Sequence, residues 1–336
     1  MSTRPLIPVR PMLLIAGLGG AALVLALLSL AMGPVALGLP RVLAAVLGRG
    51  DAVAATIVID LRLPRTLLAL GVGAMLALSG AVLQGYLRNP LAEPSVLGTS
   101  NAAALGAVVA LYYGVDFAGV ASLPLLSILG GVVGLLPLIL LSCKAAGPLA
   151  LILAGVAVAT LAGAGISLAL NFAPNPFAAV EIMNWLMGSL EDRSFRHVLI
   201  AAPCLLIGAV LLLWDGRALD ALSLGEDAAR TLGIELGAAR VRMLAGVAIG
   251  VGGAVAVSGA IGFVGLIVPH LVRPLTDRAP SSALLPSMLG GAVLLTAADM
   301  LVRAIPTEQE LRLGVVTALL GVPVFLHHLL KARRLW

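Results

Sequence analysis

Long runs without a formal charge restrict the fold of this chain more than any other feature. Most of them approach or exceed the roughly 20 residues that a helix needs to cross a hydrocarbon core. The runs are Met12–Met32, Thr66–Leu87, Ser95–Val115, Phe117–Cys143, Ala145–Val180, Val198–Trp214, Met243–Val272, Ser281–Ala298 and Leu313–Leu330. Because continuous apolar runs lack the alternation of membrane β-strands, we expect helices.

The composition agrees with a membrane protein. Hydrophobic residues make up 60% of the chain and charged residues only 11%, whereas soluble domains carry about 25% charged residues. This apolar excess excludes a soluble enzyme and a disordered chain. We interpret the formal net charge of +5 as basic residues in short membrane loops rather than as a nucleic-acid-binding surface.

The run Ala145–Val180 is too long for a single membrane helix. Near its end it is interrupted by four residues that favour turns, Asn171, Pro174, Asn175 and Pro176. Because proline stops a helix, we expect the span to end near Phe172 and an interfacial segment to follow.

Parity decides how often Met243–Val272 crosses the membrane. Basic residues at both ends of the chain predict cytoplasmic termini by the positive-inside rule; they are Arg4, Arg10, Lys331, Arg333 and Arg334. Termini on one side require an even number of crossings, so we count this run twice, with a short second crossing. The prediction is one all-α domain, residues 1–336, with ten transmembrane helices. Its first apolar run is a span rather than a cleavable signal.

The longest polar segment, Asp215–Arg242, lies on the cytoplasmic side of this layout. Ser223 is placed to cap a helix whose first turn carries Glu226 and Asp227. The remaining features of that expected helix are an apolar stripe of Leu222, Ala229 and Leu232 and a glycine at each end, Gly225 and Gly233. The segment is either a solvated loop helix or a docking surface for a cytoplasmic partner.

The sequence contains no motif of an enzyme active site. It lacks G-x-x-x-x-G-K-[ST], and neither of its lysines, Lys144 and Lys331, follows such a loop. The H-E-x-x-H, C-x-x-C and G-x-S-x-G patterns are also missing from it. We therefore expect that the chain does not hydrolyse ATP itself and that no metal or cofactor belongs to it.

Charges beside apolar runs are costly in lipid and therefore informative. Arg62 and Arg65 flank Pro64 on the outer side, and Arg303 ends a later run on the same side. Asp299 lies one helical turn before Arg303, close enough to pair with it. The arginines are either anchors at the membrane interface or an outward cationic ring that binds carboxylates of a partner protein.

The segment Asn89–Pro94, NPLAEP, interrupts the chain between two runs. Two prolines and a carboxylate predict irregular backbone, which is tolerated at membrane depth only inside protein or along a cavity. We interpret it as part of a pore or gate, with a plain tight loop as the alternative.

Four blocks of the sequence resemble one known family. They are RLPRTLLALGVGAMLALSGAVLQGYLRNPLAEPSVLGTSNAAALGA (Arg62–Ala107), SLGEDAARTLGI (Ser223–Ile234), SGAIGFVGLIVPHLVR (Ser258–Arg273) and ELRLGVVTALLGVPVF (Glu310–Phe325). In this order they are similar to the FecCD-type permease subunits of ABC importers for iron–siderophores, haem and vitamin B12.

The resemblance implies a ten-helix fold like that of vitamin B12 importer permeases, in the bacterial inner membrane. It implies a homodimer in contact with membrane lipid, two cytoplasmic ATPases that use Mg-ATP, one periplasmic binding protein and no nucleic acid. Residues that match the family's binding-protein contacts are Arg62, Arg65 and Arg303. Those that match its gate are Asn89, Leu91, Pro148 and Leu149. Those that match its ATPase coupling element, within residues 215–242, are Leu224, Gly225, Glu226, Asp227, Ala228, Arg230, Leu232 and Gly233.

Haem is the expected ligand, because Glu310–Phe325 is most similar to haem permeases; vitamin B12 and a ferric siderophore are the alternatives. Near the outer mouth, Arg193, Arg196 and His197 either meet haem propionates or form a solvated loop. An ion-coupled secondary transporter would need carboxylates inside the spans, and only Asp299 comes close.

Overall fold

The computed structural model describes residues 11–332, except 34, 96, 114–121, 144–147, 174, 306 and 308–309. The side chains of residues 142, 143, 148 and 326–332 also lie outside this description. The same holds for the terminal arginines on which the predicted orientation rests, Arg4, Arg10, Arg333 and Arg334.

The described part of the chain is helical throughout and contains no strand. Its helices are α1 (Pro11–Ala31), α2 (Leu39–Val46), α3 (Ala52–Ala55), η1 (Thr56–Arg62), α4 (Leu63–Tyr86), α5 (Thr99–Tyr113), α6 (Ser122–Cys143), α7 (Pro148–Asn171), α8 (Pro176–Leu186), α9 (Phe195–Trp214), α10 (Gly216–Ser223), α11 (Glu226–Thr231), α12 (Leu236–Ser258), α13 (Val264–Val272), η3 (Arg273–Leu275), α14 (Pro280–Ala304) and α15 (Leu313–Ala332). Every charge-free run thus falls on one or two helices, which confirms the all-α prediction.

Seven of the described helices are long and apolar enough to cross a membrane, and three shorter apolar ones accompany them. The shorter ones are Thr99–Tyr112, Val264–Leu275 and Leu313–Phe325. The predicted ten spans include all three. The structure confirms that all three are helices. By length and composition, however, seven of the ten predicted spans are long enough to cross a membrane.

Both ambiguous runs divide into two helices. The first breaks near Phe172, as predicted, and the second has the predicted short second part, for which the sequence indicated no break position. The first helix of Ala145–Val180 ends at Asn171, and α8 begins at Pro176 after an N-cap at Asn175, whose side chain accepts the Ala178 N–H at 2.9 Å. The run Met243–Val272 divides between Ser258 and Val264. The second part, α13, has nine residues, or about 14 Å, less than half of a 30 Å hydrocarbon core.

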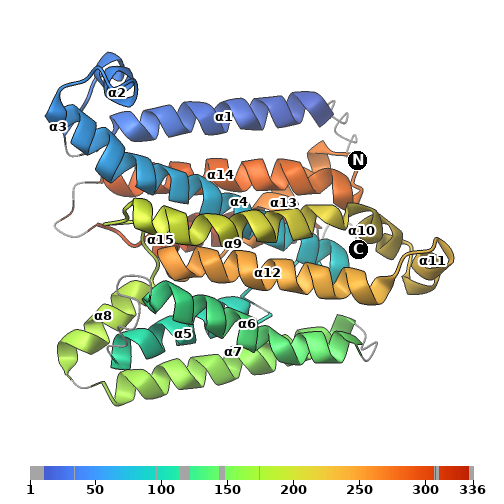
Figure 1. Cartoon of the computed structure of the whole chain (residues 1–336). Coiled ribbons are helices and arrows are strands. Elements are labelled where there is room, and N and C mark those ends of the chain that lie inside the picture. Colours follow the sequence, from blue (N-terminus) through green and yellow to red (C-terminus); the bar gives the residue numbers. More distant parts are fainter. Residues whose placement is uncertain are drawn as a thin grey trace.

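The bundle is built around α4. Of the most apolar stretch of the helix that ends in α4, 78% is buried, against 11% for α1 and 17% for α7. Figure 1 shows α1 and α7 along opposite edges of the bundle, with α4 and α12 between them. The apolar side chains left exposed on the outer helices match a hydrocarbon surrounding, whereas α4 packs against protein.

Two glycines allow the backbone of α4 to touch its neighbours directly. A Cβ atom on Gly80 would lie 1.9 Å from the carbonyl oxygen of Gly265 in α13, and one on Gly73 would lie 2.3 Å from that of Gly291 in α14. Such close approach between small residues is the main source of helix association in lipid.

We predict that Gly80→Ala destabilises the protein by about 1–3 kcal/mol, because backbone atoms of α13 must move to admit the methyl group. Thermal unfolding of the detergent-solubilised protein measures this. The matched control is Gly163→Ala in α7, where nothing lies within 4 Å of the added carbon and the helix gains propensity. Equal melting temperatures for the two variants would contradict the direct α4–α13 contact.

Candidate functional site

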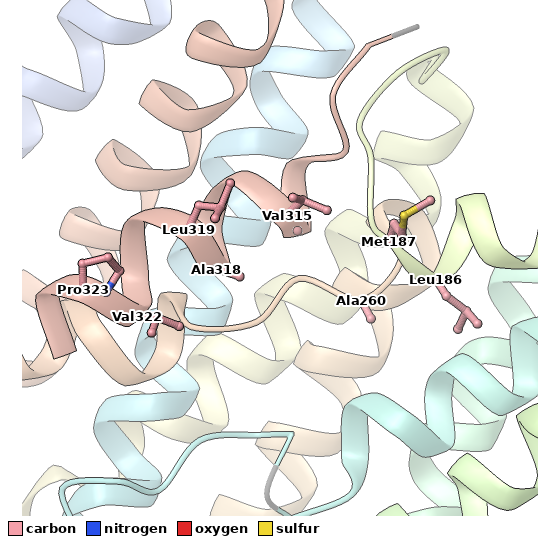
Figure 2. A pocket seen from close by; sticks show the side chains of 9 residues that line it. Leu186, Met187, Ala260, Val315, Ala318, Leu319, Val322 and Pro323 are labelled. Atoms are coloured by element: carbon pink, nitrogen blue, oxygen red, sulfur yellow. The ribbon is translucent and has the colours of Figure 1, made fainter. Parts of the chain in front are cut away.

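An apolar cavity of about 580 Å³, broadly open at the surface of the single chain, lies where the end of α8, the break after α12 and the start of α15 meet. None of its lining residues is charged: they are Leu186, Met187, Ala260, Gly314, Val315, Ala318, Leu319, Val322 and Pro323. Figure 2 shows Met187 and Ala260 on one side of it and Val315, Ala318 and Leu319 of α15 on the other. A cavity with this lining accepts a ligand with apolar faces.

Backbone hydrogen bonds fix the wall that α15 contributes to this apolar cavity. The N–H of Leu313 donates to the Gly188 carbonyl at 2.9 Å, and that of Gly314 donates to the Met187 carbonyl at 3.2 Å. A Cβ atom on Gly314 would lie 2.4 Å from the Met187 oxygen, so only glycine permits this contact. The first turn of α15 is therefore fastened to the segment after α8.

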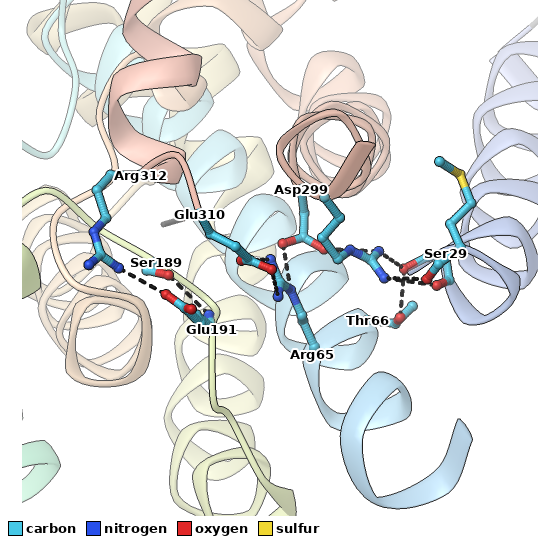
Figure 3. Close-up of polar contacts among 10 residues, drawn as sticks. Ser29, Arg65, Thr66, Ser189, Glu191, Asp299, Glu310 and Arg312 are labelled. Atoms are coloured by element: carbon cyan, nitrogen blue, oxygen red, sulfur yellow. Dashed lines mark hydrogen bonds and ion pairs between the residues drawn. The ribbon is translucent and has the colours of Figure 1, made fainter. Parts of the chain in front are cut away.

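Three arginines gather where α4 begins and α14 ends, as Figure 3 shows in part. They are Arg62, Arg65 and Arg303, and together with Asp299 and Glu310 we call them the arginine cluster. The Arg65 Nε donates to Asp299 at 2.9 Å, and its Nη1 and Nη2 donate to the two Glu310 oxygens at 3.1 and 2.7 Å. The predicted pairing of Arg303 with Asp299 is confirmed at 3.0 Å. Glu310, which is 245 residues away from Arg65 in the sequence, completes the network. It was not among the site residues expected from the sequence.

The other two arginines of the cluster fasten the end of α1. Arg62 Nη1 donates to the carbonyls of Leu30 and Ala31, both at 2.9 Å, and Arg303 Nη1 donates to that of Ser29 at 3.0 Å. The last carbonyls of a helix have no partner inside it, and cations are favoured there. These guanidinium groups therefore supply the C-terminal cap of α1.

Within this chain the arginine cluster is a partly buried network of ion pairs and hydrogen bonds. Arg62 is 6% exposed, and the side chains of Arg65 and Arg303 are 12% and 4% exposed. The reason is that each finds acceptors within its own chain. The cluster borders an outer cavity of about 490 Å³, to which Asp60 and Arg193 also contribute.

The segment between α8 and α9 closes the break at the end of α12. Arg193 Nε donates to the Val257 carbonyl at 2.6 Å, and burial lowers the pKa of this guanidinium. His197 accepts the Ser194 N–H at 3.2 Å and so caps α9. Arg196 stays exposed. Arg193 and His197 thus have structural partners in this chain.

The predicted irregular segment Asn89–Pro94 turns back into the bundle. Asn89 Oδ1 accepts the Leu91 N–H at 2.9 Å and forms a tight turn. Further on, Pro94 lies against Gly265 of α13, close to the crossing with α4. Burial raises the pKa of the Glu93 carboxyl, and Ser95 donates a hydrogen bond to it. Ala92 and Pro94 are buried, and irregular backbone is tolerated where protein covers it, whereas Pro90 and Leu91 are exposed.

The residues assigned to the gate lie in two segments. Leu91 and Leu149 expose their side chains, and Asn89 is half-buried. Pro148 begins α7, and its side chain lies outside the described residues.

The polar segment 215–242 contains two short helices where the sequence predicts one. Ser223 ends α10 and donates to the Asp220 carbonyl at 2.6 Å, whereas the N-cap of α11 is Gly225 with φ +110°. The expected Ser223 cap is therefore wrong, because only a glycine adopts the positive φ between the helices at low cost. The single apolar stripe is wrong for the same reason, since Leu222 belongs to the preceding helix.

Salt bridges hold these two helices to the bundle. Glu226 pairs with Arg240 at 2.6 Å and Asp215 with Arg242 at 2.7 Å, both across to α12. The predicted bracket of α11 by glycines is confirmed, since Gly233 also has positive φ, +78°. At the surface, Leu224 and Leu232 remain exposed. Figure 1 places α10 and α11 at the end of the bundle opposite α2 and α3.

Comparisons with known proteins agree with this geometry. A family model described as the FecCD transport family matches residues 21–331. The chain is 39% identical to the hemin transport system permease protein of Yersinia pestis, with 82% of this chain and 83% of the relative covered. It is 40% identical to the vitamin B12 import system permease protein of Vibrio cholerae (81% and 82% covered) and 41% identical to the Fe(3+) dicitrate transport system permease protein of Escherichia coli (82% and 86% covered).

A solved structure has the same fold. It is described as an inward-facing conformation of a metal-chelate type ABC transporter, with a TM-score of 0.87 and 34% identity. The match covers 96% of this chain and all of that one.

We predict that Asp299→Asn destabilises the protein by about 3–5 kcal/mol, because Arg65 and Arg303 then share no buried carboxylate. Chemical or thermal unfolding in detergent measures the loss. The matched control is Glu191→Gln, which breaks a more exposed pair with Arg312 and should cost about 1 kcal/mol or less. An Asp299→Asn variant as stable as the control would show that the arginine cluster does not hold the fold.

Proposed function

The chain belongs to the FecCD transport family of ABC importer permeases, and from this premise we propose that it moves haem from a periplasmic binding protein to the cytoplasm. As a multi-pass permease of this family it belongs to the inner membrane. Permease subunits work with a separate ATPase and a substrate-binding protein, so ATP is hydrolysed outside this chain.

The apolar cavity is the observation that favours haem. Relatives named for hemin, vitamin B12 and ferric dicitrate are 39%, 40% and 41% identical to this chain, so identity does not discriminate among them. A path with apolar walls suits the flat apolar faces of a porphyrin better than an anionic citrate complex, which loses its hydration there without compensation. Vitamin B12 and a ferric siderophore remain the alternatives.

For the assembly, we propose a homodimer with ten spans per copy, both termini cytoplasmic, two ATPases and one binding protein. The exposed Leu224 and Leu232 beside α11 support an ATPase contact at 215–242, because exposed apolar side chains on a polar cytoplasmic segment suit burial by a partner. Salt bridges to α12 make that segment a rigid lever. The coupling residues would be Leu224, Gly225, Glu226, Asp227, Ala228, Arg230, Leu232 and Gly233.

The gate and the docking surface lie at opposite ends of α4. We assign Asn89, Leu91, Pro148 and Leu149 to the inner constriction between the two copies; the exposure of both leucines in the single chain supports this. Arg62, Arg65 and Arg303 would meet carboxylates of the binding protein. Complementary charge at such a surface speeds encounter and fixes orientation.

Transport by the reconstituted importer tests the ligand. Proteoliposomes that contain the permease and its ATPase, with ATP inside and the binding protein outside, should accumulate haem and leave cobalamin and ferric dicitrate outside. The control is the same preparation without internal ATP. Accumulation of cobalamin alone would refute haem as the ligand and leave the importer architecture standing.

We predict that Leu232→Glu abolishes ATP-driven uptake, because a charge replaces an apolar side chain at the ATPase contact. Co-purification of the ATPase with the permease, and uptake in proteoliposomes, measure this. Leu47→Glu, the same change at another exposed leucine at the opposite end of the bundle, is the matched control. Normal ATPase association in Leu232→Glu would place the coupling contact elsewhere.

A further inference from the structure

The Nε, Nη1 and Nη2 groups of Arg65 all donate hydrogen bonds to carboxylates of its own chain. Its end-on pair, Nη1 and Nη2, holds both oxygens of Glu310, and Nε holds Asp299. A carboxylate binds guanidinium most strongly through two parallel N–H groups. An incoming carboxylate must therefore replace one of the two residents to bind Arg65 in this way.

The two residents differ in how easily they leave. Asp299 is 1% exposed and also pairs with Arg303 at 3.0 Å, so its departure would strand two buried cations. The Glu310 side chain is 29% exposed, and among the residues that the structure describes it forms an ion pair with Arg65. Released from Arg65, its carboxylate regains water at low cost. Glu310 is the replaceable one.

We propose that Glu310 holds the place of the binding protein's carboxylate in the undocked permease, and that docking exchanges one carboxylate for the other on Arg65. This inference rests on the docking role proposed above for the arginine cluster. The exchange conserves the charge around Arg65, so two carboxylates face the three arginines of the cluster in both the bound and the free permease.

The position of Glu310 connects this exchange to the apolar cavity. Three residues after it, Leu313 donates to Gly188, and Gly314 then donates to Met187, which lines the apolar cavity. Arg312 adds a pair with Glu191 at 3.1 Å (Figure 3). Release of Glu310 removes the strongest of the side-chain tethers on the start of α15, because a bidentate pair exceeds a single contact. Docking thus loosens one wall of the apolar cavity.

Binding affinities of three variants test the exchange in the intact importer, held in lipid nanodiscs with its ATPase. Glu310→Gln should bind the importer's binding protein roughly tenfold more tightly, because the internal competitor is weakened. Arg65→Gln should bind it at least tenfold more weakly. Asp60→Asn is the matched control: it removes one charge from an exposed residue of the same outer cavity and should leave the affinity within about twofold.

Each outcome is decisive. Unchanged affinity in Glu310→Gln together with weak binding in Arg65→Gln refutes the exchange and leaves docking intact. Unchanged affinity in Arg65→Gln refutes the docking role itself. Equal tightening in Asp60→Asn and Glu310→Gln shows bulk electrostatics and also refutes the exchange. Should Arg65→Gln fail to fold, Arg65→Lys keeps the charge, lacks the fork and should also weaken binding.

Hydrogen exchange supplies a readout that affinity does not give. In the wild-type permease the Leu313 and Gly314 amides are hydrogen-bonded and should exchange slowly until the binding protein is added. In Glu310→Gln they should exchange faster without it. Slow exchange in the variant, equal to that of the undocked wild type, would overturn the link between Glu310 and the apolar cavity.

Discussion

Direct backbone contact between α4 and its neighbours is the constraint on which the rest of the structure depends. Lipid supplies no hydrophobic force between helices, so association requires close approach, and Gly73 and Gly80 permit it. Once α4 is fixed against α13 and α14, its first turn presents Arg65 to Asp299. Its last turn leads into Asn89–Pro94, of which Ala92 and Pro94 are buried. The arginines of the proposed docking surface therefore lie at the start of α4, and the proposed gate residues Asn89 and Leu91 follow its end.

Breaks in helices near membrane depth are the second requirement of this fold. The chain leaves the helical conformation between α12 and α13, at Gly259–Phe263, where backbone groups lose their helical hydrogen-bond partners. Side chains from elsewhere bond to backbone groups on both sides of the break. Arg193 donates to Val257 near the end of α12. Gln84 donates at 3.2 Å to Gly265 and Leu266 in α13, where Pro269 has no N–H for the Gly265 carbonyl. Every such hydrogen bond is necessary, because unpaired backbone groups are costly away from water. Specific hydrogen bonds therefore stabilise the breaks, which distinguish this fold from a bundle of continuous helices.

Much of the fold was predictable because the charge-free runs, and the residues that stop helices, act locally. The break before Pro176 and the pairing of Asp299 with Arg303 followed from spacing alone. Contacts between distant segments were not predictable in this way. Glu310 lies 245 residues from Arg65, and no local sequence pattern indicates that its carboxylate accepts hydrogen bonds from Arg65. The Ser223 cap failed for a different reason, since a serine that follows a helix and one that precedes a helix look alike in sequence.

The fastening of α1 has a consequence for how the protein is made. Its terminal carbonyl at Ser29 is held by Arg303, 274 residues further along the chain. During synthesis the first helix therefore enters the membrane long before the guanidinium that completes it has left the ribosome. Until then the Ser29 carbonyl must rely on water or lipid headgroups, whereas Arg62 is already present to hold those of Leu30 and Ala31. The cap of α1 is thus completed only after α14 has been made.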